Sequence, residues 1–384
     1  MSNILLGVTG CISAYKAASL IREFKKNGDD VKVILTQNGS KFITPLTLRT
    51  LSENKVYTSL FDDENEWSTE HISLSRWADI FVVAPASANI IGKFASGIAD
   101  DLLSTTFLSF EKNVLIVPTM NESMFENKAT VENIRILKER GVVVMEPEEG
   151  FLACGEEGKG RFPKVEKIFL LTNRLLFPEE KLRGKRVIIT GGGTFERIDP
   201  VRVITNLSSG RMALSFAKAS FFNKAEKILF VHGRMDEKPF DFSENVYVES
   251  SEHMKSVLEK NIDRYDILIM AAAVADFRPD YSKEKIKKKE EFDLKLCKTE
   301  DILKSLKDKK ILKIGFALES EKHLEEGMKK LKEKNLDYIV INDKENLGKE
   351  KGSVVVISKN GEELSIKNVD KFEIALKVIE WIKF

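Results

Sequence analysis

The chain has 384 residues, which exceeds the usual length of one domain and predicts two. Hydrophobic residues make up 42% of it, so two sizeable cores are possible and a largely disordered protein is excluded. The 61 basic and 60 acidic residues leave a net charge of +1, and no global charge points to nucleic acid or to an anionic membrane as a partner.

The protein is expected to be cytoplasmic. The longest apolar run, Ile267–Ala275, is far shorter than the ~20 residues that cross a bilayer, and no signal-peptide pattern stands at the start. Cys11, Cys154 and Cys297 are an odd number at wide spacing, which predicts no disulfide framework. None of the four histidines has a metal-ligand spacing with a cysteine, so we expect no metal site made by the protein.

Short apolar runs alternate with helical patterns in both halves of the chain. In the first half the expected strands are residues 4–8, 31–35, 80–84, 114–117 and 142–145. Helices are expected between them, for example at residues 14–26 and 131–140. The expected strands of the second half are residues 187–190, 228–231, 267–271, 313–317 and 338–341. This alternation is typical of α/β folds with parallel sheets.

The end of the chain and its middle have their own signals. A hairpin of strands 354–357 and 363–366 is expected to turn at Asn360-Gly361, and a helix at 370–382 follows it. Residues 178–185 contain proline and glycine and lack an apolar period, which predicts a linker. The expected domains are therefore residues 1–177 and 186–384, each with a Rossmann-like three-layer fold.

Two turns of small residues are expected to follow strands in the first domain. Gly10 to Ser13 opens a helix after the first strand, and Pro85 to Asn89 follows the strand that ends at Ala84. Open α/β sheets bind ligands at the carboxyl ends of their strands, and small residues let backbone N–H groups approach a phosphate. Such turns are also common without a phosphate, and Ser87 is equally suited to cap a helix.

Three further segments of the first half carry candidate reactive groups. His71 stands in the segment Glu70–Asp79, Asn121 follows an expected strand, and Cys154 precedes a glycine-rich, charged segment that is typical of a mobile flap. Each group has an ordinary alternative: a structural histidine, a turn residue and an incidental cysteine.

Taken in order, these segments resemble the motifs of the flavin-containing cysteine decarboxylases, specifically phosphopantothenoylcysteine decarboxylase. The resemblance covers almost all of residues 1–175, and its motifs are Pro-Ala-Ser-Ala-Asn, His-Ile-x-Leu-x-Arg-Trp-Ala-Asp, Pro-x-Met-Asn-x-x-Met and Leu-Ala-Cys-Gly-x-x-Gly-x-Gly-Arg. It implies a flavodoxin-like domain that binds FMN through Gly10, Ser13, Thr36, Ser87 and Asn89. It also gives His71 an acid/base role, Asn121 the substrate carboxylate and Cys154 the role of proton donor.

These implied roles make chemical sense. The carboxylate of a cysteine has no electron sink, but oxidation of its CH₂–SH group by FMN to a thioaldehyde places a C=S group β to that carboxylate. Loss of CO₂ then gives an enethiolate, to which reduced FMN returns the hydride. A thiol with a pKa near ~8.5 is mostly protonated at neutral pH and can donate the final proton. Two departures from the family are Cys11 in place of glycine, which can alter FMN affinity, and Phe162-Pro163-Lys164-Val165 in place of Met-Pro-Glu-Pro.

Four segments of the second half are candidates for nucleotide chemistry. Thr190–Thr194 is a glycine turn suited to a phosphate. Ile198–Gly210 is small, polar and helix-breaking, and it contains Arg202 and Asn206, which can hold phosphate or acyl oxygens. The ordinary alternative for Asn206 and Ser208 is helix capping. Ala271–Asp276 ends a strand with small residues and an acceptor, which suits a base ring. Lys283–Lys289 is either a solvated loop, as composition favours, or a clamp over pyrophosphate.

This ordered set resembles bacterial phosphopantothenate–cysteine ligase as far as about residue 343. The resemblance implies that CTP and Mg²⁺ convert the pantothenate carboxylate to an acyl-cytidylate, which the amine of cysteine then attacks. It implies that Arg202 and Asn206 bind the substrate, with Asn206 orienting the acyl-cytidylate. The implied CTP site consists of Gly192, Ala272, Asp276, Lys285, Asp301, Phe316, Lys330 and Lys334. In it Asp276 reads cytosine and Lys285 neutralises phosphates, while Gly191 and Glu300 depart from the family's alanine and proline.

Both resemblances together imply one bifunctional enzyme of coenzyme A biosynthesis. The ligase half would join cysteine to 4'-phosphopantothenate, and the decarboxylase half would convert 4'-phosphopantothenoylcysteine to 4'-phosphopantetheine. The family implies trimeric decarboxylase units and dimeric ligase units, which a dodecamer would satisfy. Two competing hypotheses are a two-domain nicotinamide-dependent dehydrogenase, for which neither half has Gly-x-Gly-x-x-Gly with a suitably placed acidic residue, and a non-catalytic FMN-binding regulator.

Overall fold

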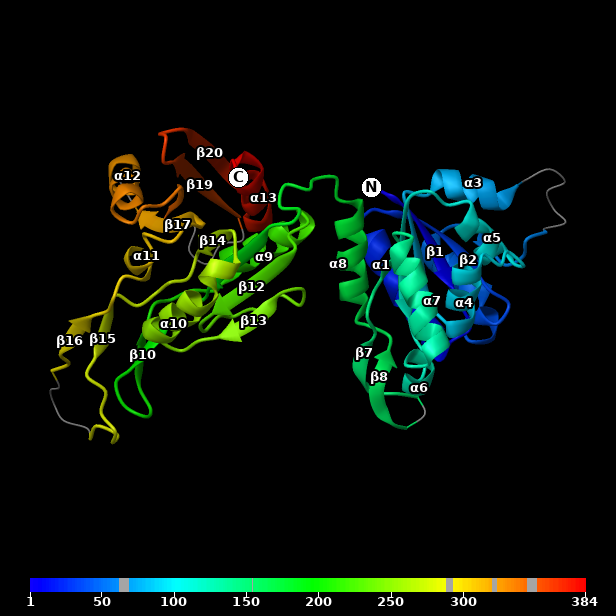
Figure 1. Cartoon of the computed structure of the whole chain (residues 1–384), viewed down its shortest axis with the longest axis horizontal. Coiled ribbons are helices and arrows are strands. Elements are labelled where there is room, and N and C mark those ends of the chain that lie inside the picture. The colour runs from blue at the N-terminus through cyan, green and yellow to red at the C-terminus, as the bar shows by residue number, and fades with distance from the viewer. Residues whose placement is uncertain (62–68, 154, 288–292, 320–322, 344–350) are drawn as a thin grey trace. The chain divides into compact units, whose positions relative to one another are not determined.

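The computed structural model describes all of the chain except residues 62–68, 154, 288–292, 320–322 and 344–350. The chain forms two compact units, Met1–Pro178 and Glu179–Phe384, each with its own sheet. Figure 1 shows both, and each is described by itself below. No helix in the described part of the chain is long and apolar enough to span a membrane.

The first unit is built around a six-stranded parallel sheet with the order β3-β2-β1-β4-β5-β6. Its strands are β1 (Asn3–Val8), β2 (Asp30–Leu35), β3 (Val56–Tyr57), β4 (Ile80–Ala86), β5 (Asn113–Pro118) and β6 (Val143–Val144). Without the two-residue edge strand β3, this is the 2-1-3-4-5 order of flavodoxin. The flavodoxin-like fold expected for this half is confirmed.

Helices cover this sheet, and the apolar stripes of the sequence explain how. The helices are η1 (Ile12–Lys16), α1 (Ala17–Lys26), η2 (Gly39–Lys41), α2 (Pro45–Ser52), α3 (Glu70–Trp77), α4 (Ala88–Ser96), α5 (Leu102–Leu108), α6 (Glu122–Phe125), α7 (Lys128–Glu139) and α8 (Val165–Leu176). The strand residues Ile80–Ala84 are fully buried, which is why they form an unbroken apolar run. On α1, Leu20, Ile21 and Phe24 recur at helical spacing and are also fully buried.

The glycine-rich segment near the end of the first unit forms a hairpin. Its strands are β7 (Glu148–Phe151) and β8 (Glu157–Arg161), which pair antiparallel. Gly160 lies so close to the β5 turn that a Cβ there would come 2.1 Å from the carbonyl oxygen of Met120. The hairpin is therefore anchored beside the carboxyl end of β5.

The second unit contains an eight-stranded sheet with the order β13-β12-β9-β14-β17-β18-β19-β20. Its strands are β9 (Arg186–Gly191), β12 (Lys227–His232), β13 (Glu244–Tyr247), β14 (Ile267–Met270), β17 (Leu312–Glu319), β18 (Tyr338–Asp343), β19 (Lys351–Ser358) and β20 (Glu363–Asp370). The first six in the sheet order are parallel, with the 3-2-1-4-5-6 order of a Rossmann fold. The expected hairpin β19–β20 is present, and Gly361 in its turn has a φ of +82°.

Helices pack on both faces of this second sheet. They are α9 (Arg211–Phe222), α10 (Ser251–Asn261), η3 (Ile262–Arg264), α11 (Ile302–Ser305), α12 (His323–Glu333) and α13 (Lys371–Trp381). Residues of α10, α11 and α12 share one buried cluster with the sheet, whereas α9 packs with α13. The doubly wound architecture expected for this half is confirmed as well.

Two short antiparallel pairs extend the second unit and are absent from the sequence-based prediction. They are β10 (Phe195–Arg197) with β11 (Val203–Thr205), and β15 (Phe277–Pro279) with β16 (Leu296–Lys298). The strands β10 and β15 lie side by side at one end of this unit (Figure 1). Segments that are ~80 residues apart in the sequence are thereby brought together, and both contain candidate site residues.

Candidate functional site

A first candidate site lies at the carboxyl ends of β1 and β4, where the strand order of the first sheet reverses. Thr9 connects the two turns that follow these strands. Its hydroxyl donates to the carbonyl oxygen of Pro85 (2.8 Å) and accepts from the backbone N–H of Ser87 (3.0 Å). Ligands of open α/β folds bind at such a switch point. The two turns singled out in the sequence therefore meet where a ligand is expected.

Gly10 and Thr36 lie at this same edge. A Cβ on Gly10 would lie 2.5 Å from the Cβ of Asn38, so the turn after β1 can pass the turn after β2 only without a side chain. The backbone N–H of Thr36 donates to the carbonyl oxygen of Val8 at 3.0 Å. Ser13 is 6% exposed in η1. Glycine, serine and threonine thus converge on one narrow, polar edge.

Ser87 and Asn121 both cap helices, which is the ordinary alternative for Ser87, whereas a turn residue is the alternative for Asn121. The hydroxyl of Ser87 accepts from the N–H of Ile90 (3.4 Å) at the start of α4, where Asn89 is exposed in the first turn. The side-chain oxygen of Asn121 accepts from the N–H of Ser123 (2.9 Å) at the start of α6. Capping holds each residue at the carboxyl end of its strand, next to the candidate site.

The hairpin β7–β8 packs against the turn that carries Asn121. The carboxylate of Glu122 accepts from the N–H of Lys159 at 2.8 Å, and a Cβ on Gly158 would lie 2.6 Å from that carboxylate. Cys154 lies outside the described residues, in the sequence between β7 and β8. Gly158 and Gly160 of this motif therefore have a packing reason, which is close approach to the Asn121 turn.

Neither departure from the family pattern disrupts this edge. The thiol of Cys11 lies 3.2 Å from the hydroxyl of Ser13 and 3.5 Å from the carbonyl oxygen of Thr119, so it fills space between the β1 and β5 turns. Phe162 is 2% exposed, and the ammonium of Lys16 lies 5.4 Å from its ring centre. Burial and the nearby Arg161 lower the pKa of Lys16.

His71 is not brought together with these groups within one chain. Its carbonyl oxygen accepts from the hydroxyls of Ser75 (2.7 Å) and Ser109 (3.5 Å), and Ser109 ends α5 just before β5 begins. Helix α3, which carries His71, lies at the end of the first unit opposite α6 and the hairpin β7–β8 (Figure 1). His71 is thus placed near the amino ends of the strands, whereas Asn121 follows a carboxyl end.

A second candidate site lies at the carboxyl ends of β9 and β14, the switch point of the second sheet. Gly192 has a φ of +69°, and a Cβ there would lie 2.6 Å from the carbonyl oxygen of Arg234. The N–H of Ala273 donates to the carbonyl oxygen of Gly192 (2.8 Å), and the N–H of Ala272 donates to the hydroxyl of Thr190 (3.2 Å). The glycine turn and the alanine run therefore form one surface.

We expect Gly192→Ala to destabilise the second unit more than Gly361→Ala does. Both glycines have a positive φ, which costs an alanine ~1–2 kcal/mol. A Cβ on Gly361 meets nothing within 4 Å, whereas one on Gly192 collides with backbone. Differential scanning calorimetry of both variants should give the larger fall in Tm for Gly192→Ala. Equal shifts would contradict the close packing of this turn.

Asn206 lies above this glycine turn. Its side-chain amide donates to the carbonyl oxygen of Val274 (2.9 Å). A Cβ on Gly193 would lie 2.5 Å from the backbone carbonyl oxygen of Asn206, so the two segments are in close contact. The hydroxyl of Thr205 donates to the carbonyl oxygen of Thr194 at 2.8 Å. Asn206 thus joins the glycine turn to the segment that ends in Asp276.

Thr299 connects several residues of the expected nucleotide site and was missed in the sequence. Its N–H donates to the carbonyl oxygen of Asp276 (2.9 Å), and its hydroxyl donates to that of Ala275 (2.7 Å). Two residues later, Asp301 caps α11 and pairs with Lys334 at 3.1 Å. The structure therefore links Asp276, Asp301 and Lys334 through one short segment. The one signal in the sequence was its position directly before Glu300, which departs from the family pattern.

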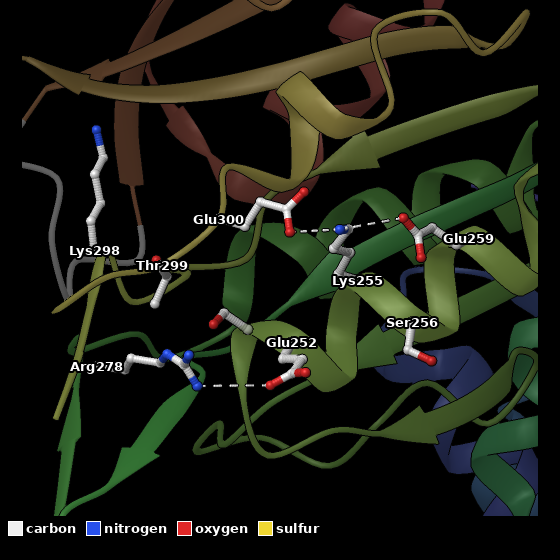
Figure 2. Close-up of a pocket in the computed structure, with 9 residues that line it drawn as sticks. Glu252, Lys255, Ser256, Glu259, Arg278, Lys298, Thr299 and Glu300 are labelled. Carbon is white, nitrogen blue, oxygen red and sulfur yellow. Dashed lines mark ion pairs between the residues drawn. The ribbon is translucent and has the colours of Figure 1, made fainter. Parts of the chain in front are cut away.

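Glu300, the acidic residue that departs from the family pattern, forms an ion pair within the protein. Its carboxylate lies 2.7 Å from the ammonium of Lys255, which also lies 3.6 Å from Glu259. The hydrogen bond to Glu300 raises the pKa of Lys255. These charges line a cavity of about 410 Å³ beside α10, and Lys298 points away from them (Figure 2). The negative charge of Glu300 is thus directed to α10.

Phe316 and the helix that carries Lys330 lie on opposite faces of the second sheet. The ring of Phe316 packs edge-on against Phe216 of α9, with 5.5 Å between ring centres. Its neighbour Ala317 belongs to the cluster that contains Leu331 of α12. Because successive strand side chains point to opposite faces, Phe316 lies on the other face of the sheet from α12, which carries Lys330.

Arg202 joins the lysine-rich segment to the second site. Its guanidinium donates to the carbonyl oxygen of Ile286 at 2.9 Å, although the side chain of Lys285 is itself exposed.

Among the residues that the structure describes, no group of three or more His, Cys, Asp and Glu side chains is placed to hold a metal ion.

A flavodoxin-like domain followed by a Rossmann-type domain, each with candidate ligand-binding turns at its switch point, places the chain among two-domain α/β proteins that bind ligands at these edges. Comparisons with known proteins identify the family. The Flavoprotein family matches residues 1–176, and the DNA/pantothenate metabolism flavoprotein C-terminal domain matches residues 182–384. The coenzyme A biosynthesis bifunctional protein CoaBC of Bacillus subtilis (strain 168) is 39% identical over 390 residues, covering 99% of this chain and 96% of that protein. The chain belongs to the family of coenzyme A biosynthesis bifunctional proteins.

Two further relatives are similar to this chain. A cysteine/cysteine sulfinic acid decarboxylase from an unknown prokaryotic organism is 41% identical over 349 residues, covering 87% of this chain and 95% of that protein. The crystal structure of the C-terminal domain of a CoaBC protein is 36% identical and covers 53% of this chain and 95% of that one, with a TM-score of 0.47.

Proposed function

We propose that this chain carries out two successive steps of coenzyme A biosynthesis. Its second unit ligates cysteine to 4'-phosphopantothenate, and its first unit decarboxylates the resulting 4'-phosphopantothenoylcysteine to 4'-phosphopantetheine. The observation that carries this proposal is that candidate turns from both halves meet at the switch points of two doubly wound sheets in one chain, Thr9 with Ser87 in the first and Asn206 with Val274 in the second. Membership of the CoaBC family supports it across nearly the full length.

FMN is the cofactor that the first site fits. The turn at Gly10 has no room for a side chain, and Ser13, Thr36, Ser87 and Asn89 offer hydroxyl and amide groups along the same edge. These residues would hold its phosphate, ribityl chain and ring. Bound FMN would take up and return the hydride that makes loss of CO₂ from a cysteine carboxylate possible. Asn121 would orient the substrate carboxylate, His71 would move a proton, and Cys154 would donate the last one.

We expect Cys154→Ser to stop the decarboxylase after CO₂ has left. A serine hydroxyl is a far poorer acid than a thiol, so the product should accumulate as an enethiol that lacks the returned hydride and proton. Mass spectrometry of the products, with the flavin spectrum as a check on binding, measures this. Cys297→Ser, which changes the half-buried thiol on β16, is the control and should act as wild type. Wild-type phosphopantetheine formation by Cys154→Ser would remove Cys154 from its role.

CTP is the nucleotide that we assign to the second site. Asp276 would read the cytosine, and Gly192 and Ala272 would let the nucleotide approach the backbone. Lys285, Lys330 and Lys334 would neutralise its phosphates, with Asp301 holding Lys334. Phe316 would complete the site from the adjacent strand. Arg202 and Asn206 would bind the acyl group. We assign Mg²⁺ to the CTP phosphates, because this ion is commonly held by substrate phosphates instead of an all-protein cage.

We also propose a homo-oligomer with trimeric decarboxylase and dimeric ligase contacts, which a dodecamer would satisfy. The separation of His71 from Asn121 in one chain supports a decarboxylase site shared between protomers. Ile12 and Tyr15, next to the Gly10 turn, are 56% and 58% exposed. In the second unit, Leu207, which follows β11, and Phe277 on β15 are 92% and 50% exposed. Native mass spectrometry tests the assembly.

One coupled assay tests the proposed function. Purified protein receives 4'-phosphopantothenate, cysteine and CTP, and pyrophosphate and CO₂ are measured together. Both should appear, and both should vanish when either CTP or phosphopantothenate is omitted. The relative named a cysteine/cysteine sulfinic acid decarboxylase makes free cysteine a second candidate substrate. Release of CO₂ from cysteine alone would favour that activity over the proposed one.

A further inference from the structure

Asp199 is a buried carboxylate of the second unit to which the proposed reaction assigns no role. Its side chain is fully buried. One oxygen accepts from the N–H groups of Val201 and Arg202, both at 2.8 Å. The other oxygen accepts from the N–H of Ile286 at 3.2 Å, across 87 positions of sequence. Asp199 therefore closes its own turn and also holds a distant segment.

The distant segment is held at several backbone atoms. Asp199 accepts a hydrogen bond from the N–H of Ile286, and the guanidinium of Arg202 donates to the carbonyl oxygen of Ile286 at 2.9 Å. Four residues earlier, the N–H of Ser282 donates to the carbonyl oxygen of Ile198 at 2.9 Å. Residues 282–286 are thus fastened to the turn 198–202 at both ends.

This anchor is ionic at neutral pH. Burial by itself raises the pKa of Asp199, but the N–H donors of Val201, Ile286 and Arg202 and the charge of Arg202 outweigh it, so the pKa lies below the usual range. Hydrogen bonds to an ionised acceptor are stronger than those to a neutral one. A carboxylate is therefore a stronger hydrogen-bond acceptor for the Ile286 N–H than a neutral amide of the same size.

We propose that Asp199 is a positioning residue of the ligase, which fixes the backbone at Ile286 so that the adjoining Lys285 is held at the phosphates of the nucleotide. The inference rests on the proposed function, because it assumes that Lys285 meets CTP. Lys285 is exposed and has a long, flexible side chain, so its own contacts do not explain a fixed position. Its backbone neighbour is fixed on both polar atoms.

The test is Asp199→Asn in the full-length protein. The amide oxygen can keep the two bonds to Val201 and Arg202, but the NH₂ group then faces the Ile286 N–H and cannot accept from it. We expect faster tryptic cleavage after Lys285 and Lys287, because local opening exposes the backbone. We also expect pyrophosphate release to fall by about 10²-fold, mainly in kcat, as a misplaced catalytic contact predicts. Asp337→Asn is the matched control.

Asp337 makes a comparable anchor elsewhere, since its carboxylate accepts from the N–H of Lys313 (3.0 Å) and pairs with Lys359 (2.6 Å). Its loss should change neither cleavage at Lys285 nor the nucleotide reaction. A double variant, Asp199→Asn with Lys285→Gln, separates positioning from a structural role. If Asp199 acts through Lys285, the double variant is no slower than Lys285→Gln alone, whereas additive losses overturn the proposal. Should Asp199→Asn fail to fold, Asp199→Ser retains an acceptor for the turn and carries the same comparison.

The remaining outcomes are equally informative. Faster cleavage with unchanged pyrophosphate release makes Asp199 a merely structural anchor and refutes the positioning role. Unchanged cleavage together with unchanged release also refutes it. If the wild-type protein itself releases no pyrophosphate from CTP and phosphopantothenate, the proposed ligase fails first, and the positioning role falls with it.

Discussion

Replacing Lys285 by glutamine is expected to slow pyrophosphate release from CTP by about 10²–10³-fold, the usual effect of removing an electrostatic contact made in a transition state. Glutamine keeps much of the length of lysine but lacks the charge that would meet the phosphates during acyl-cytidylate formation. The loss should appear without cysteine, because the amine enters only in the second half-reaction. Rapid quench with labelled CTP measures it directly.

Two variants serve as comparisons for Lys285→Gln. Lys283→Gln removes an exposed charge from the same segment and should change the rate by no more than a few-fold, since isolated surface charges have weak effects. Asn206→Asp should allow some pyrophosphate release yet impair amide formation, so that acyl-cytidylate accumulates. Near-normal release by Lys285→Gln would mean that this lysine belongs to a solvated charged face.

His71→Asn is expected to abolish decarboxylation while the ligase reaction stays within a few-fold of wild type. Asparagine keeps a polar side chain but cannot exchange a proton near neutral pH. His71 belongs to the first compact unit and the ligase motifs to the second, so the ligase has no structural reason to fail. Separate assays of CO₂ and pyrophosphate on one preparation measure both effects. Equal loss of the two activities would contradict separate sites.

Mixed oligomers test why His71 lies away from the Asn121 edge. We expect His71→Asn and Asn121→Ala each to be inactive as decarboxylases. If a site takes His71 from one protomer and Asn121 from another, a 1:1 mixture assembled together should regain about a quarter of wild-type activity, because half of each contribution is intact. No recovery in oligomers shown to be mixed would contradict a shared site.

The strands and their class could be predicted because their signals are local. Runs such as Ile80–Ala84 and Ile267–Met270 are apolar throughout, since parallel strands between two helical layers are buried on both faces. The rule that ligands bind at the carboxyl ends of strands then placed Gly10, Ser87, Gly192 and Asp276 near sites before any contact was known. The order of β-strands within each sheet has no such local signal.

The missed features all depend on contacts between distant segments. The pairs β10–β11 and β15–β16 contain three residues per strand, too few for a periodic pattern to appear. Thr299 and Asp199 act through bonds to backbone groups that are 24 and 87 positions away, and a backbone acceptor or donor leaves no trace in residue type.

Residue order and residue type were therefore sufficient for the two α/β domains, the family motifs and the edge of each sheet at which the glycine turns lie. The tertiary structure decided which groups share that edge: it joins Asn206 to Val274 and Lys334 to Asp301, and it leaves His71 near the opposite end of the first unit from Asn121. The physical reason is that burial patterns are properties of single segments. Contact between two side chains from distant segments depends on the order of the strands and on the packing of the connections between them.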